Sequence, residues 1–164
     1  MKKVVAMSDN HGDEGYIYQV LEYESDADIF VHCGDSESYD QELLRKFFAV
    51  RGNNDWGLNL KEHLILQVAG HRIYVCHGHK AGYFNRQITL VSLAHENNCD
   101  IVLSGHTHIA CHEIYEGVHL VNPGSTRLPR GYNGPSYCVL YLDDEKVDVV
   151  FKSMDDGQVM NLEG

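Results

Sequence analysis

The chain opens with an apolar run and a polar loop, Val4-Val5-Ala6-Met7-Ser8-Asp9-Asn10-His11-Gly12, and this stretch decides the fold. Four consecutive apolar residues that end at polar ones are typical of a short buried strand. Asp9 and His11 are two positions apart, so on an extended segment their side chains face the same way. The sequence therefore opens with a strand that presents two potential metal ligands where it ends.

The same unit, an apolar run followed by a glycine-containing polar loop, recurs five more times. The loops are Cys33-Gly34-Asp35 after 29–32, Arg51-Gly52-Asn53-Asn54-Asp55 after 47–50, His77-Gly78-His79 after 73–76, Ser104-Gly105-His106-Thr107-His108 after 101–103, and Asn122-Pro123-Gly124-Ser125 after 118–121. In open α/β sheets, ligands bind outside the carboxyl ends of the strands. We therefore expect these loops to converge at one edge of the fold.

Helices are expected between the early strands, and mostly strands thereafter. Apolar spacing predicts helices over 14–24, 37–46 and 84–97 and further strands over 64–69, 137–142 and 147–151. From about Ser104 onward the pattern is nearly all strand, so the prediction is an α/β fold whose C-terminal part supplies a second run of adjacent strands. One domain is expected over 1–164, with a polar tail from about 154 whose end, 157–164, frays.

Composition excludes several classes of function. The 164 residues include 24 acidic and 13 basic side chains, a formal charge of −11, and 43% are hydrophobic. This apolar content argues against disorder. The charge argues against binding long nucleic acid through a basic surface, and against docking on an anionic membrane. Five cysteines without a CxxC pair, no apolar run of membrane-spanning length and an early Asp9 predict a cytoplasmic protein.

The loops contain a candidate ligand set of two carboxylates, one carboxamide and four imidazoles, without a thiolate. These residues are Asp9, His11, Asp35, Asn53, His77, His106 and His108. Seven ligands exceed one tetrahedral site and fit two divalent ions that share a bridging Asp. Mixed oxygen and nitrogen ligands suit manganese, iron, nickel, cobalt or zinc. We expect manganese, with magnesium also compatible.

Other residues near these loops have competing interpretations. Arg127 and Arg130 follow the Asn-Pro-Gly-Ser turn and either clamp an anionic substrate or have a surface role. Asp55 is expected to shape its turn, and Trp56 is expected to pack in the interior rather than line a pocket. The six histidines outside the ligand set are expected to be structural or superficial: His32, His63, His71, His95, His112 and His119. Tyrosines near the C-terminus either serve a homo-oligomer interface or pack in the core.

The order of the motifs resembles the calcineurin-like metallophosphoesterases, from Met1 to about Phe151. The motifs are Asp9-x-His11, Gly34-Asp35, Gly52-Asn53-x-Asp55, His77-Gly78-His79 and Gly105-His106-Thr107-His108. The short chain and the Asn122-Pro123-Gly124-Ser125 turn resemble the small, single-domain YfcE-like phosphodiesterase branch. The resemblance implies a four-layer α/β/β/α sandwich of two packed mixed sheets, with a dinuclear metal centre at one end.

The resemblance also implies how the ligands are shared. One ion would be held by Asp9, His11, Asp35 and His108, and the other by Asp35, Asn53, His77 and His106, with Asp35 as the bridge. Two such ions would activate a shared water for in-line attack on a small phosphodiester. Larger members of the family usually have His where this chain has Asn54. An amide cannot protonate a leaving alkoxide, although Asn54 can hydrogen-bond a phosphoryl oxygen, so His79 is the candidate substitute.

Three functions are compatible with these residues to different degrees. A phosphodiesterase that prefers activated aryl esters is the leading one. A phosphomonoesterase or protein phosphatase on the same centre ranks lower because the chain lacks long insertions for a peptide groove and lacks His at position 54. A non-catalytic scaffold, like the retromer subunit of the same fold, would have a degraded ligand set, whereas all seven positions are present here.

Overall fold

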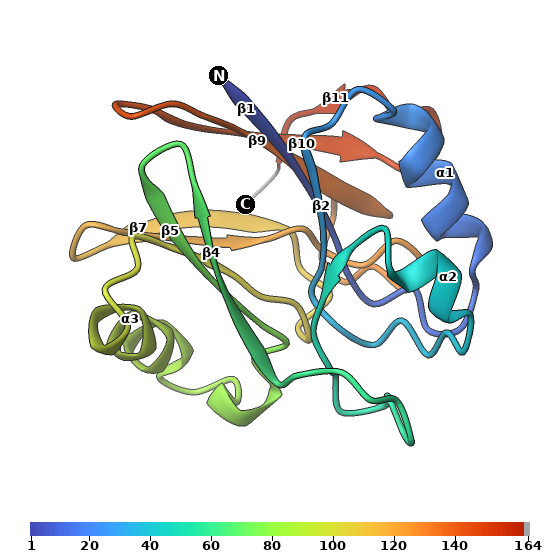
Figure 1. Cartoon of the computed structure of the whole chain (residues 1–164), viewed down its shortest axis with the longest axis horizontal. Helices are drawn as coiled ribbons and strands as arrows, with labels where there is room; N and C mark the ends of the chain where they lie inside the picture. The colour runs from blue at the N-terminus through green and yellow to red at the C-terminus, as the bar shows by residue number, and fades with distance from the viewer. Residues whose placement is uncertain (163–164) are drawn as a thin grey trace.

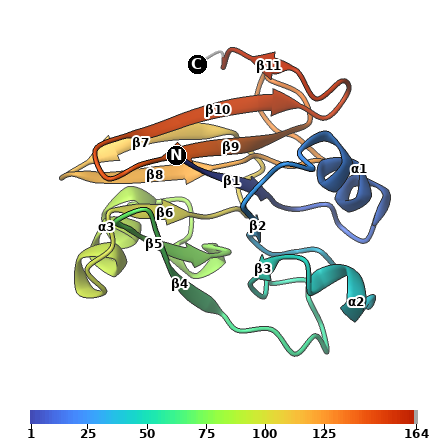
Figure 2. The ribbon, with the colours of Figure 1, turned by 45° about the horizontal axis from the view of Figure 1, so that its top comes forward.

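The structure, a computed structural model, describes residues 1–162 and contains two stacked mixed sheets (Figures 1 and 2). The strands of the first sheet are β1 Lys2–Met7, β2 Ile29–His32, β3 Phe48–Ala49, β9 Ser136–Leu142, β10 Val147–Ser153 and β11 Val159–Met160. The strands of the second are β4 His63–Val68, β5 His71–Cys76, β6 Ile101–Leu103, β7 Cys111–Tyr115 and β8 Val118–Asn122. Their orders are β11-β10-β9-β1-β2-β3 and β4-β5-β6-β8-β7.

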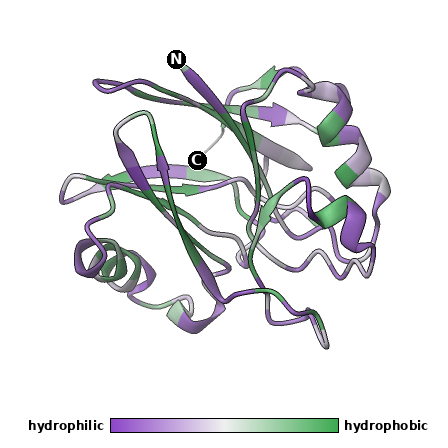
Figure 3. Ribbon diagram, viewed as in Figure 1, coloured by the Kyte–Doolittle hydropathy of each residue, from purple (hydrophilic) through white to green (hydrophobic). Residues whose placement is uncertain are grey.

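Strand β1 contributes to two separate cores because successive side chains of a strand point to opposite faces. Val4 and Ala6 are fully buried between the two sheets, where they pack with residues such as Ile101 of the second sheet. Val5 and Met7 are fully buried on the other face, against the helices. Figure 3 shows the change along this strand from the hydrophilic Lys2–Lys3 end to the hydrophobic remainder. An apolar run without alternation is therefore required at this position.

Helices cover the outer face of each sheet and complete four layers. Helices α1 Gly15–Tyr23 and α2 Gln41–Leu44 lie on the first sheet, where Ile17 and Val20 of α1 pack. Helix α3 Arg86–Glu96 lies on the second sheet, as Figure 2 shows, with its buried Leu90, Val91 and Ala94 against the strands. This arrangement confirms the expected α/β/β/α sandwich.

The helix expected over 37–46 is wrong in extent, because α2 begins only at Gln41. Glu37 adopts a left-handed backbone (φ +48°), and its N–H donates to the Asp55 carboxylate at 2.8 Å. Ser36 and Ser38 also make side-chain bonds to nearby backbone N–H groups. These local bonds compete with helix formation, and the helix starts where the Asp40 carboxylate accepts from Leu43 N–H.

The structure contains two strands that the sequence pattern does not predict, β7 Cys111–Tyr115 and β11 Val159–Met160. The expectation that the tail frays is wrong for the residues up to 162, which are ordered against the fold. Strand β7 is an edge strand whose residues are part-buried or exposed and whose apolar residues do not alternate with polar ones, so it lacks the pattern of a buried strand. Strand β11 pairs with β10, and Met160 and Leu162 pack against the core between the sheets. Met154 is 2% exposed. Residues 163 and 164, also part of the expected tail, lie outside the described residues. Among residues 1–162, no helix combines the length and apolar character that a membrane crossing needs.

Candidate metal centre

The loops with the candidate ligands converge at the carboxyl ends of β1, β2, β5 and β6, and backbone hydrogen bonds join them in pairs. Asp9 N–H donates to the Gly34 carbonyl and His11 N–H to the Asp35 carbonyl, each at 3.0 Å. Gly105 N–H donates to the His77 carbonyl, also at 3.0 Å. Each bond connects two loops that bear ligands, so the loops are fixed relative to each other by the main chain rather than by the side chains alone.

Five of the seven candidate ligands adopt a left-handed backbone, which is uncommon for residues other than glycine. These five, with φ between +45° and +73°, are Asp9, His11, Asp35, His106 and His108. Such conformations cost free energy and are found where the surrounding structure imposes them, most often at functional sites. The strain is therefore concentrated in the residues whose side chains the sequence marked as ligands.

Gly52 and Gly105 lie so close to the aspartate loops that there is no room for a side chain at either position. A Cβ at Gly52 would collide with the Asp35 carboxylate, and one at Gly105 would collide with Ser8 Oγ and with Asp9 Oδ2. The absence of a side chain at these positions lets the loops close around the two carboxylates.

The ligand atoms meet around two carboxylate oxygens. Asp9 Oδ1 lies 3.3 Å from His108 Nε2, 3.7 Å from His11 Nε2 and 3.8 Å from His77 Nε2. Asp35 Oδ2 lies 3.2 Å from His77 Nε2 and 4.0 Å from His11 Nε2. Two groups with metal-ligand spacing result, Asp9–His11–His108 and Asp9–Asp35–His77. Asp9, rather than Asp35, is the residue common to both groups.

Each of the three clustered imidazoles is oriented through its second ring nitrogen. His77 Nδ1 lies 2.8 Å from the Cys33 carbonyl, and His108 Nδ1 lies 2.7 Å from the Leu128 carbonyl. His11 Nδ1 lies 2.8 Å from the Glu37 carboxylate. A carbonyl or carboxylate can only accept, so Nδ1 donates and Nε2 is directed at the carboxylates. Metal-binding histidines are oriented in this way.

Two buried atoms at the centre of the cluster have no hydrogen-bond partner, namely Asp9 Oδ1 and His77 Nε2. Leaving buried polar atoms unpaired costs free energy, so a native fold normally satisfies them. A divalent cation would satisfy both atoms at once. The donor set, oxygen and imidazole nitrogen without thiolate, also fits such a cation. The residues present therefore fit the metal that the sequence predicts.

The charges in the cluster support one another. Burial opposes ionisation of Asp9, but the nearby imidazoles of His108 and His77 hold the pKa of Asp9 below its usual value. Burial likewise opposes charge on His77, yet the carboxylates of Asp35 and Asp9 raise the pKa of His77. The site thus stabilises anionic carboxylates around a position that attracts positive charge.

Three predicted site residues lie beside the cluster rather than within it. The His106 ring is 5.2 Å from the His77 ring between centroids, and its backbone N–H donates to Asp9 Oδ2. Burial, with the nearby His77, lowers the pKa of His106 to about 4, so this imidazole is neutral at pH 7. The Asn53 side chain is exposed. Asn54 instead contacts the cluster, through its backbone N–H to Asp35 Oδ1 and its amide to Asp35 Oδ2.

The remaining predicted residues line the rim. His79 has its ring centroid 5.5 Å from that of His77, and burial together with the neighbouring His77 lowers the pKa of His79. Arg127 is exposed, and its guanidinium donates to the His11 carbonyl at 2.6 Å. Asp55 shapes its turn, as expected, by accepting from the N–H groups of Asp35, Glu37 and Gly52. The interior position expected for Trp56 is wrong, because this side chain is 73% exposed.

Two residues that support the centre, Glu37 and Arg86, have no signal in the sequence pattern. Glu37 orients His11 from a segment expected to be helical, so no local pattern could have revealed it. Arg86, at the start of α3, donates to the carbonyls of Gly78 and Gly105 and thereby connects two of the histidine loops. A charged residue at the end of an amphipathic helix gives no distinctive sequence signal.

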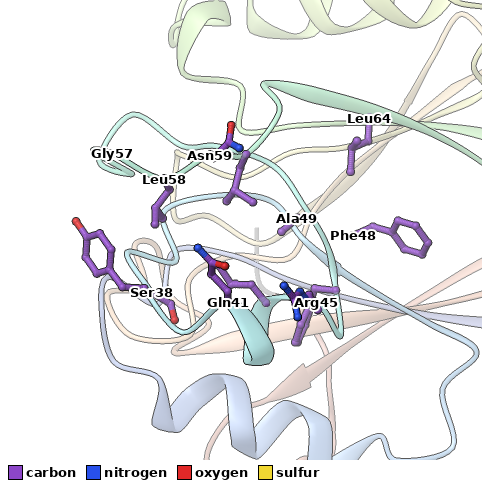
Figure 4. A pocket seen from close by; sticks show the side chains of 13 residues that line it. Ser38, Gln41, Arg45, Phe48, Ala49, Gly57, Leu58, Asn59 and Leu64 are labelled. Atoms are coloured by element: carbon purple, nitrogen blue, oxygen red, sulfur yellow. The ribbon is translucent and has the colours of Figure 1, made fainter.

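A hollow of about 490 Å³ lies elsewhere, between α2, β3 and the segment 57–60 (Figure 4). Its labelled side chains include Gln41, Phe48, Leu58 and Leu64. None of the seven candidate ligands lines it. Size alone therefore does not identify the functional site in this protein.

His32, expected to be structural, is fully buried behind the centre. Its ring bonds the Asn10 side chain at 2.7 Å and the Gly34 N–H at 3.0 Å. Burial lowers the pKa of His32 to about 4, and nearby carboxylates offset this only in part. A histidine that is neutral when folded contributes stability above pH 6.5, and this stability is lost as the pH falls towards 4.

We therefore expect the metal-free protein to lose about 2 kcal/mol of unfolding free energy between pH 7 and pH 5 through His32 alone. Urea denaturation in the presence of a chelator, with wild type and His32→Gln compared at both pH values, measures this contribution. The variant should show the smaller loss. Equal losses in the two proteins would assign the acid sensitivity to other groups.

Two stacked mixed sheets, outer helices and a cluster of aspartates and histidines beyond the strand ends together define a metallophosphoesterase. Comparison with known proteins gives the same class. The family model for the calcineurin-like phosphoesterase superfamily domain matches residues 1–145, so the chain belongs to this family. The result confirms the family predicted from the motifs.

Individual relatives span nearly the whole chain. The probable metallophosphoesterase YsnB of Bacillus subtilis is 33% identical over 162 residues, covering 98% of this chain and 96% of YsnB. A predicted phosphoesterase from Streptococcus pneumoniae, 28% identical, superposes with a TM-score of 0.87 over 97% of this chain and 92% of that one.

More distant structures share the fold. The phosphoesterase Yfce of Escherichia coli is 24% identical with a TM-score of 0.73, covering 97% of each chain. A Vps29 mutant from Entamoeba histolytica is 21% identical with a TM-score of 0.79, covering 96% of each chain.

Proposed function

We propose that this protein is a metal-dependent phosphodiesterase that hydrolyses small phosphodiesters at a centre holding two divalent cations, with manganese the expected metal. The observation that carries the proposal is the convergence of three oriented imidazole nitrogens on the carboxylates of Asp9 and Asp35, with two buried atoms left unpaired. When bound, two such cations supply Lewis acidity and a nucleophilic water at neutral pH.

The chain's own residues would divide the remaining work. His106 and Asn53 are proposed to complete the ligand set, Asn53 by turning its exposed side chain inward. Asn54, which bonds both oxygens of Asp35, is proposed to keep that carboxylate oriented. Arg127 is proposed to contact the substrate phosphate, since its guanidinium lies at the rim beside His11. The five cysteines are free, which supports a reducing, cytoplasmic location.

His79 is proposed as the leaving-group donor. It lies on the rim beside His77, whereas the amide of Asn54 is engaged with Asp35 and cannot supply a proton. Burial and the neighbouring His77 lower the pKa of His79, so less of it is protonated at neutral pH, and diesters whose leaving group needs little protonation, such as aryl esters, are favoured. The presence of every predicted ligand position argues against the scaffold interpretation, and the short loops argue against a protein phosphatase.

An assay of the manganese-loaded protein on bis(p-nitrophenyl) phosphate and on p-nitrophenyl phosphate tests the proposal. We expect faster hydrolysis of the diester and its loss in Asp35→Ala, while His79→Ala slows alkyl esters more than aryl esters. A preference for the monoester would instead indicate a phosphatase. A metal-loaded protein that cleaves neither ester would indicate a scaffold.

A further inference from the structure

Trp56 occupies an unusual position for the only tryptophan of the chain. Its side chain is 73% exposed, although a large aromatic ring gains more than other side chains from burial. The loop that carries it is nevertheless held in place, since Tyr39 Oη donates to the Trp56 backbone carbonyl at 3.1 Å. The exposed ring is thus presented by an anchored backbone.

Trp56 lines a hollow of about 180 Å³, here called the Trp56 hollow, whose lining also includes Arg51, Asn53, Glu62 and His79. This volume is below the roughly 300 Å³ of a site for a drug-sized molecule. It admits a single ring system, and the rest of the ligand would extend outside it.

The hollow adjoins the metal centre through two of its walls. The loop that contains Asn53 and Trp56 also contains Asn54, which bonds both oxygens of Asp35. His79 also lines the hollow, and its ring lies 5.5 Å from the ring of His77. A phosphate at the centre would therefore hold its organic substituent within reach of the Trp56 hollow.

The polar groups of the hollow distinguish among ring systems. Arg51 donates hydrogen bonds and Glu62 accepts them. Glu62 also pairs with Lys80 at 2.7 Å, but both side chains are mostly exposed, so this pair contributes little and leaves Glu62 able to exchange partners. A plain aryl ring would use the indole face alone. A heteroaromatic ring with donors and acceptors on its edge would use every group.

We propose that the Trp56 hollow binds the base of a small nucleotide phosphodiester, with the base stacked on the Trp56 indole and its edge bonded by Arg51 and Glu62. The position of the phosphate rests on the proposed function, whereas the stacking of the base does not. The occupant is a single nucleotide unit, because the −11 charge of the protein disfavours a long polyanion.

Two substrates that release the same leaving group test the proposal by kinetics, namely the p-nitrophenyl ester of thymidine 5′-phosphate and methyl p-nitrophenyl phosphate. Base–aromatic stacking contributes about 1–3 kcal/mol, so Trp56→Ala should raise KM for the thymidine ester about 5- to 100-fold. The KM for the methyl ester and both kcat values should be unchanged. Trp56→Phe, which keeps an aromatic face, should restore most of the affinity.

A matched control removes an exposed aromatic ring from another place. Phe48, 48% exposed, lines the hollow of Figure 4, and Phe48→Ala should leave both substrates unaffected. Equal changes for the thymidine and methyl esters in Trp56→Ala, or no change for either, would overturn the proposal.

Fluorescence separates this inference from the proposed activity. Trp56 is the only indole in the chain, so adenosine, which has no phosphate, should quench the emission of the metal-loaded protein, while ribose at the same concentration should not. If neither ester were hydrolysed but adenosine still quenched, the activity would be wrong and the base site right. If adenosine and ribose changed the Trp56 emission equally, the proposed base site would be wrong.

Discussion

Replacing Asp9 by Asn should abolish metal binding at both halves of the centre. Loss of a residue that only hydrogen-bonds a metal ligand typically costs about 10- to 100-fold in activity, and the loss of diesterase activity in Asp9→Asn should be larger. Asp9 belongs to both ligand groups, and its Oδ1 is the buried, unpaired oxygen that three imidazole nitrogens surround. The amide is nearly the same size, but it has no charge to offer a cation.

The measurement is the melting temperature with and without manganese, together with the metal content. Binding to the folded state adds about 2.7 kcal/mol of stability at a ligand concentration of 100 Kd, so wild type should melt higher when loaded. Asp9→Asn should melt at the same temperature with or without metal. Asp13→Asn, the same change at an exposed position of the same loop, should respond like wild type. A metal-dependent rise in Asp9→Asn would contradict the shared role of Asp9.

Replacing Arg86 by Ala should destabilise the protein by about 3 kcal/mol and weaken metal binding, although Arg86 contacts none of the ligand side chains. Its guanidinium donates to the carbonyls of Gly78 and Gly105 at 2.7 and 2.8 Å, and to Ser104 Oγ at 3.2 Å. Its removal leaves two buried carbonyls without this charged donor, and each such loss costs about 1–3 kcal/mol. The loops of His77 and His106 would then lose one of their links and would keep the bond from Gly105 N–H to the His77 carbonyl.

Urea denaturation and manganese titration by calorimetry measure the two effects separately. Arg86→Lys should recover only part of the loss, because an ammonium lacks the planar fork that reaches several acceptors at once. Arg45→Ala is the matched control, since Arg45 is exposed and pairs with the exposed Glu42. Its effect should stay within about 0.5 kcal/mol. If the folded Arg86→Ala variant bound manganese as tightly as wild type, Arg86 would have a structural role only and the prediction would be contradicted.

Much of the fold could be predicted from the sequence because buried strands have a local signature. The run Val4–Met7 is apolar on both faces, since each face packs against a different layer, and the other interior strands share this property. The edges of the sheets were predicted less well. Strand β7 is part-buried to exposed without regular alternation, and β11 has only two residues, so neither strand has a recognisable pattern of its own.

The candidate site divides in a similar way. Residue type and spacing determined by themselves which side chains would gather, because Asp and His directly after strands must lie at the same edge of the sheets. The orientation of those side chains was decided only by the tertiary structure. The three imidazoles are turned by the Cys33 and Leu128 carbonyls and by Glu37, and these acceptors lie 20 to 44 residues away along the chain.

Asn54 contacts Asp35, whereas the side chain of Asn53, the expected ligand, is exposed, and this difference also depends on the tertiary structure. Both are asparagines in one turn, and the sequence cannot say which amide faces Asp35, because the Asp55 carboxylate fixes the turn from the other side through the N–H groups of Asp35 and Gly52. Residue patterns along the chain were sufficient for the interior strands, the types of candidate ligand and the family. Only the tertiary structure decided which atoms face one another, because that depends on hydrogen bonds between loops that are distant in sequence.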